Sequence, residues 1–148
     1  MYTIEEFDKS KTKVLKYIMY QRRSESEVRN KFSKNIDEDM LADIIEYLKE
    51  AKYLDDIDYI SKKIENFMLL KNMSIKEIQY KLIEKGLKRN DIEDYIYANE
   101  EKLNEFETKS AKNIILKKSN CQEDIEEVKK YLYKKGYKTE NINVALKY

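Results

Sequence analysis

The sequence contains few side chains that could make or break covalent bonds. It has no His, so histidine general bases, histidine metal ligands and Ser-His or Cys-His nucleophiles are excluded. Its single cysteine, Cys121, can form neither an internal disulfide nor a thiolate zinc site. The two glycines, Gly86 and Gly136, lie too far apart for a glycine-rich phosphate loop. We therefore predict a protein that is not an enzyme and that has no metal or other cofactor.

Charged side chains make up 40% of the chain, and their chemistry is the binding of oppositely charged groups. The net charge is only +1, yet basic and acidic residues alternate in bands. Residues 11–34 hold eight basic and two acidic residues, whereas residues 35–66 hold four basic and ten acidic ones. This pattern has two interpretations: a segregated surface for nucleic acid or charged proteins, or solvated faces whose charges pair between helices.

The elements that would position these charges are predicted to be helices. The chain has no Pro and only two Gly, and therefore lacks the turn residues that hairpins, sandwiches and barrels need. Apolar residues recur instead at spacings of three and four, which is typical of helices with one buried face. We predict an all-α fold.

A repeat of about 50 residues organises the sequence. Ser24, Ser74 and Asp124 are each followed three positions later by Glu, which is the capping-box pattern of a helix start. Ser119 or Asn120 could instead cap the third of these helices earlier. Gly86 and Gly136 occupy equivalent places after the capped helices, and Asn35 fits the same place with a one-residue deletion. At these three positions we expect a left-handed residue that ends a helix.

Nine helices follow from these signals. We expect them near residues 11–21, 24–34, 38–51, 57–71, 74–85, 90–104, 106–118, 121–135 and 140–147. They form three tandem three-helix units of helix-turn-helix type, at 11–55, 56–104 and 105–148, after an N-terminal tail at 1–10. A unit of this size buries too little surface to be stable alone. We therefore expect each unit to be stabilised by contacts with its neighbours in an elongated, curved array.

Two further patterns bear on metal binding and on location. Asp55, Asp56 and Asp58 could suggest a metal site, but acidic residues also favour a helix start, and no glycine supplies the turn of a calcium loop. The longest apolar runs are four residues, far short of a membrane span. With no disulfide and no signal-like stretch, we expect a cytoplasmic protein that does not bind membranes.

Two stretches of the sequence resemble the RecX family of recombination regulators. One is Arg22–Phe32 (RRSESEVRNKF), which resembles the basic helix start of that family. The other is Tyr47–Tyr59 (YLKEAKYLDDIDY), which has Lys52 where the family pattern often has Gly. Residues 74–87 extend the likeness, and the third unit matches weakly.

The resemblance implies a non-enzymatic protein that binds the RecA recombinase, lies in the groove of its filament on DNA, and mainly inhibits ATP hydrolysis and strand exchange. By the same resemblance, Arg22, Arg23, Arg29 and Lys31 are candidate contacts to the filament or its DNA. Arg29 and Lys31 could equally pair with neighbouring Glu25 and Glu27. The alternative function is direct DNA binding by helix-turn-helix-like units. We expect a monomer.

Overall fold

The computed structural model describes residues 1–121 and 124–147. Within those residues the chain folds into nine helices and no strand, which confirms the all-α prediction. The helices are α1 (Ile4–Tyr20), α2 (Glu25–Phe32), α3 (Glu38–Glu50), α4 (Asp56–Leu70), α5 (Ile75–Glu84), α6 (Arg89–Ala98), α7 (Glu100–Asn120), α8 (Ile125–Lys134) and α9 (Thr139–Lys147). None of them is long and apolar enough to cross a membrane.

Capping boxes start α2 and α5, as their sequences predict. The Ser24 and Ser74 hydroxyls each accept a hydrogen bond from the backbone N–H of the glutamate three residues on, and that glutamate accepts one from the serine N–H. Asp124 caps α8 by accepting from Glu126 N. The expected helix at 121–135 therefore starts later, at Ile125, and residues 122–123 of that prediction lie outside the described part of the chain.

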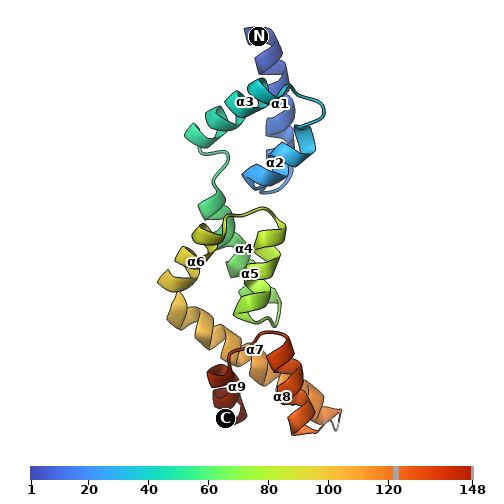
Figure 1. Cartoon of the computed structure of the whole chain (residues 1–148), viewed down its shortest axis with the longest axis vertical. Coiled ribbons are helices and arrows are strands. Elements are labelled where there is room, and N and C mark those ends of the chain that lie inside the picture. The colour runs from blue at the N-terminus through green and yellow to red at the C-terminus, as the bar shows by residue number, and fades with distance from the viewer. Residues whose placement is uncertain (122–123, 148) are drawn as a thin grey trace.

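The buried apolar side chains form three separate clusters along an elongated molecule (Figure 1). The first lies between α1, α2 and α3, the second between α4, α5, α6 and the start of α7, and the third between the rest of α7, α8 and α9. The accessible surface is 10396 Å², whereas a compact monomer of this mass would expose about 8000 Å². The division into three equivalent units at 11–55, 56–104 and 105–148 stays a prediction.

Three local expectations were wrong. The first ten residues are not a tail, because Thr3 and Glu6 form a further capping box that starts α1 at Ile4. Asn35 is not left-handed. The first repeat is one residue shorter here than the other two, so the chain leaves α2 through a right-handed turn in which Ile36 N donates to Phe32 O at 2.9 Å. Lys52 takes that conformation instead, with φ of 64°, at the end of α3.

The third error concerns the helices expected at 90–104 and 106–118. The break lies at Asn99, whose side-chain amide donates to Tyr95 O at 2.9 Å. Helix α7 then continues without interruption from Glu100 to Asn120. Its buried residues Leu103, Phe106 and Glu107 recur at spacings of three and four across residue 105, where the break was expected. One helix therefore contributes to both the second and the third cluster.

The same contacts join the clusters at two places 50 residues apart. At the first junction, between α2 and the turn after α5, the Ser24 hydroxyl donates to Lys85 O at 2.8 Å. At the second junction, between α5 and the turn after α8, the Ser74 hydroxyl donates to Lys135 O at 2.7 Å. The following residues, Gly86 and Gly136, have φ of 83° and 94°. A Cβ on Gly136 would lie 2.8 Å from Lys76 Cβ, so conformation and space both require glycine there.

Candidate functional site

The two arginines that precede α2 make different contacts. Arg22 is half exposed and forms an ion pair with Asp58 of α4 across the first junction. Arg23 lies with its guanidinium 4.0 Å from the centre of the Tyr17 ring, donates from Nε to Tyr17 O at 3.4 Å, and lies 4.0 Å from Glu27. Its side chain is only 14% exposed, so Arg23 packs against α1 and α2 rather than projecting into solvent.

Arg29 and Lys31 lie on the exposed side of α2. Arg29 Nε is 3.8 Å from Glu25, as one of the two interpretations of the sequence allows. Lys31 has no acidic partner among the described residues, and its Nζ lies 5.7 Å from the centre of the Tyr17 ring. The fold thus brings Arg23 and Lys31 together on one tyrosine, whereas Arg22 faces the junction. An exposed ion pair such as Arg29–Glu25 contributes little to stability, so Arg29 can exchange Glu25 for another anion.

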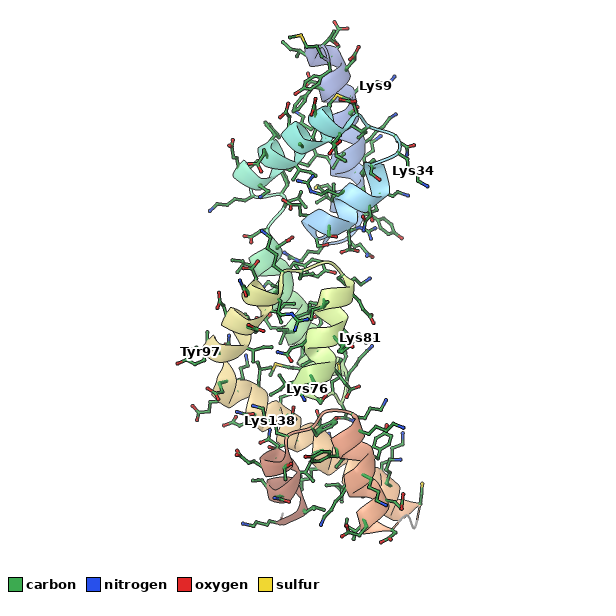
Figure 2. The ribbon with its side chains drawn as sticks, viewed as in Figure 1. Lys9, Lys34, Lys76, Lys81, Tyr97 and Lys138 are labelled. Atoms are coloured by element: carbon green, nitrogen blue, oxygen red, sulfur yellow. The ribbon has the colours of Figure 1, made fainter. Side chains whose placement is uncertain are left out.

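Further exposed lysines continue this surface past the end of α2 and onto α5 and its flanks. Among the described residues, Lys34, Lys76, Lys81 and Lys85 are exposed and form no ion pair. In Figure 1, α2, α5 and α8 follow one another on one side of the molecule, and Figure 2 shows Lys34 and Lys81 on that side. The 50-residue repeat could have indicated them, since Lys81 is equivalent to Lys31 and Lys135 to Lys85.

Aromatic side chains interleave with these lysines. Tyr80 on α5 and Tyr133 on α8 are 72% and 66% exposed. A hollow of about 290 Å³ lies beside Tyr80, and Lys76, Ile83 and Arg89 help to line it. We call the basic residues of α2, α5, α8 and their flanking turns, together with these tyrosines, the basic face. Cations with exposed aromatic rings can bind anionic groups and flat ring systems, and also the anionic surface of a protein.

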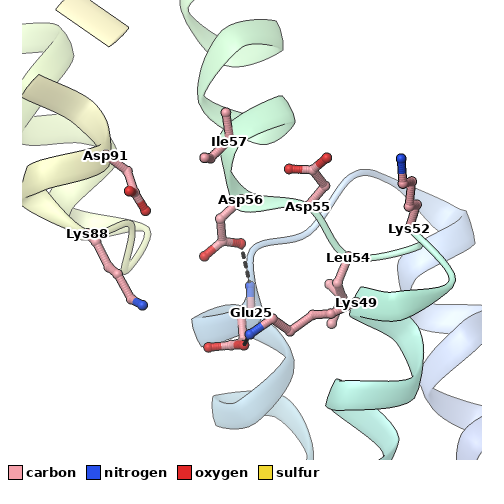
Figure 3. A pocket seen from close by; sticks show the side chains of 9 residues that line it. All are labelled: Glu25, Lys49, Lys52, Leu54, Asp55, Asp56, Ile57, Lys88 and Asp91. Atoms are coloured by element: carbon pink, nitrogen blue, oxygen red, sulfur yellow. Dashed lines mark hydrogen bonds and ion pairs between the residues drawn. The ribbon is translucent and has the colours of Figure 1, made fainter. Parts of the chain in front are cut away.

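A charged pocket of about 330 Å³ lies at the first junction, lined from α2, α3, α4, α6 and the turn between α3 and α4 (Figure 3). Lys49 Nζ lies 3.1 Å from Glu25, and this contact raises the pKa of Lys49. Asp56 accepts from Glu25 N at 2.9 Å, yet burial raises the pKa of its carboxyl group, with Asp91 adding to the effect. Within the described residues no group of acidic or sulfur ligands could hold a metal ion.

The corresponding place at the second junction is closed by Glu107 of α7. Its side chain is fully buried and accepts from Ile75 N and Lys138 N, both at 2.7 Å, and from the Asn141 amide at 3.0 Å. This carboxylate therefore joins the starts of α5 and α9 to α7. Both junctions are used for internal contacts, which leaves the exposed basic face as the candidate site.

Comparison with known proteins gives a consistent set of relatives. No family model matches the chain. A protein named regulatory protein RecX from Staphylococcus carnosus is 32% identical over 136 residues, which cover 89% of this chain and 51% of that protein. A protein of the same name from Clostridium botulinum is 31% identical over 138 residues, 87% of this chain and 63% of that protein. The chain thus spans about half to two thirds of the length of such relatives.

Solved structures agree with the sequence relatives. The crystal structure of RecX from Lactobacillus salivarius has a TM-score of 0.85 with this chain at 22% sequence identity, covering 98% of this chain and 97% of that one. A second structure, of a regulatory protein RecX, has a TM-score of 0.83 at 21% identity. These structures show a shared fold. The sequence relatives have the same name, and their similarity covers most of this chain. The chain therefore belongs to the RecX family of regulatory proteins.

Proposed function

We propose that this protein regulates the RecA recombinase by binding along the RecA filament on DNA, and that it mainly inhibits ATP hydrolysis and strand exchange. Membership of the RecX family supports the choice of RecA as the partner. The proposal includes a monomer that acts in the cytoplasm without catalytic activity of its own, built from three tandem units in a curved array.

The observation that carries the proposal is the basic face on an elongated molecule. Exposed cations recur on α2 and α5 and continue towards α8, so several of them can contact a long partner at once. A filament offers repeated anionic groups, both on its DNA and on its subunits. Many weak contacts then add up without a deep pocket. Of the sequence candidates, Arg29 and Lys31 remain candidate filament or DNA contacts, and Arg22 and Arg23 join them once their internal contacts are released.

The test is a titration of DNA-dependent ATP hydrolysis by RecA. We expect the protein to slow hydrolysis at less than one copy per RecA subunit. Reversing the equivalent lysines together, as Lys31→Glu with Lys81→Glu, should weaken inhibition at least 10-fold, because two contacts become repulsive. The matched control is Lys9→Glu with Lys13→Glu on α1, which makes the same change in net charge. Unchanged hydrolysis under saturating protein, with no filament binding, would reject the proposal.

Direct DNA binding is the second candidate, and the exposed Tyr80 and Tyr133 beside lysines favour it because bases can stack on such rings. Binding to naked single-stranded DNA should then occur without RecA and fall steeply as salt rises. Under the first proposal, the affinity for the filament exceeds the affinity for naked DNA. Measuring both affinities at two salt concentrations separates the candidates.

A further inference from the structure

Two pairs of large apolar side chains lie exposed at the ends of α1 and α4. Met19 and Tyr20 are 73% and 83% exposed, and Leu69 and Leu70 are 81% and 79% exposed. The pairs are 50 residues apart and each closes its helix. Single exposed apolar residues are common on soluble proteins, but adjacent ones at equivalent positions of two helices are typical of a binding surface.

Two residues before each pair, an aromatic ring has two cations on it. Arg23 and Lys31 lie on the ring of Tyr17 in α1. The Nζ atoms of Lys63 and Lys71 each lie 5.9 Å from the centre of the ring of Phe67 in α4. Tyr17 and Phe67 are themselves 50 residues apart, so the same combination of an apolar pair and two cations on a ring occurs twice.

A groove continues the second pair towards α7. It has a volume of about 450 Å³, and its apolar lining is Met68, Leu69 and Phe106. Its charged lining is Glu65, Lys102, Glu105 and Lys109. A lining that combines apolar and charged side chains suits a protein side chain that is flanked by polar groups.

We propose that Met19–Tyr20 and Leu69–Leu70 are two equivalent docking points that insert into apolar pockets bordered by carboxylates on two successive subunits of a protein polymer. The exposed Lys31 on the Tyr17 ring and the exposed Lys71 on the Phe67 ring favour a pocket bordered by carboxylates. The aliphatic Leu69 and Leu70 have no ring on which a base could stack, which favours a protein partner over nucleic acid. This inference rests on the proposed function, because the polymer is taken to be the RecA filament.

Two docking points on one chain give a specific expectation for binding strength. Once the first pair is bound, the second binds at a high effective concentration, so losing either pair should cost far more than a single surface contact. Losing both should leave only the contribution of the basic face. A non-polymeric partner could engage one pair at a time.

The experiment measures binding to RecA filaments on single-stranded DNA by fluorescence anisotropy. The label goes on Cys121, which is the single cysteine and is exposed. The variants are Met19→Ser with Tyr20→Ser, Leu69→Ser with Leu70→Ser, and all four changes together. The control is Ile4→Ser with Leu116→Ser, two exposed apolar residues outside the pairs. Circular dichroism confirms that each variant keeps its helical content.

We expect each pair variant to bind the filament about 100-fold more weakly, the fourfold variant to bind more weakly still, and the control to change less than about threefold. Affinity for naked single-stranded DNA should not change. If the wild type binds filaments and the pair variants bind equally well, the inference is wrong and the proposed function stands. A parallel loss on naked DNA would make the pairs a nucleic-acid surface and also overturn it. If the wild type does not bind filaments, both proposals fail.

Discussion

Lys52 holds a backbone conformation that suits glycine. Its φ is 64°, and the hydrogen bonds around it, from Lys52 N to Lys49 O and from Tyr53 N to Leu48 O, match those around Gly86 and Gly136. The left-handed region places a Cβ close to the following carbonyl oxygen. The family resemblance found in the sequence points to the same position, since glycine is frequent there.

At the scale of this residue we predict that Lys52→Gly stabilises the protein. Relief of the left-handed strain exceeds the added freedom of glycine in the unfolded chain, giving a gain of about 0.5–1 kcal/mol in the free energy of unfolding. Urea denaturation measures it. Lys52→Ala keeps the Cβ and is the control, for which we expect no gain. An equal gain in Lys52→Ala would show that the charge of Lys52, not its backbone, is responsible.

At the scale of elements, two acidic residues at equivalent places accept hydrogen bonds from different numbers of helix starts. Glu107 reaches the starts of both α5 and α9 and is fully buried. Asp56 is one methylene shorter and accepts a hydrogen bond from Glu25 N at the start of α2. Asn141 supplies a donor to Glu107, whereas the equivalent Asp91 adds a like charge near Asp56.

We therefore predict opposite results for two matched amide substitutions. Glu107→Gln turns one acceptor oxygen into a donor that faces a backbone N–H, and should lower the free energy of unfolding by about 2–3 kcal/mol. Asp56→Asn keeps one acceptor for Glu25 N and removes a charge whose raised pKa shows that burial disfavours it. It should leave stability unchanged or slightly increased. Thermal unfolding of both variants tests this, and equal losses would contradict it.

At the scale of the whole molecule, each junction buries one tyrosine near the glutamate of a capping box. Tyr59 of α4 lies near Glu27, and Tyr137, before α9, lies near Glu77. Both side chains are 3% exposed. Burial, followed by the adjacent glutamate, raises the pKa of each phenol well above its ordinary value of about 10. The two tyrosines come from different elements but serve equivalent junctions.

These shifts predict a loss of stability in alkali. A group whose pKa is raised in the folded state contributes fully below its unfolded pKa, and the contribution falls as the unfolded chain ionises above about pH 10. We expect the free energy of unfolding of the wild type to fall more steeply between about pH 9 and pH 11 than that of Tyr59→Phe with Tyr137→Phe. The control is Tyr97→Phe, which alters a tyrosine that is 81% exposed. Equal slopes for the wild type and the double variant would refute the prediction.

The sequence by itself determined the helical class and the starts and stops set by local chemistry. A capping box joins residues three positions apart, so Ser24 with Glu27 and Ser74 with Glu77 start their helices whatever lies around them. Gly86 and Gly136 end helices because a left-handed residue is costly for any side chain with a Cβ. The same capping rule, applied to Thr3 and Glu6, would also have predicted the start of α1.

Only the tertiary structure decided which of these local units contact one another and which charges remain exposed. Ser24 donates to a carbonyl 61 residues away, and Arg22 pairs with Asp58 across the same junction. Neither contact has a sequence signal, because it depends on how two clusters pack. For the same reason Arg23 is partly buried against Tyr17 while Lys31, eight residues on, is exposed. The alternating basic and acidic bands of the sequence predict a basic surface, but tertiary packing decides which basic residues are exposed on it.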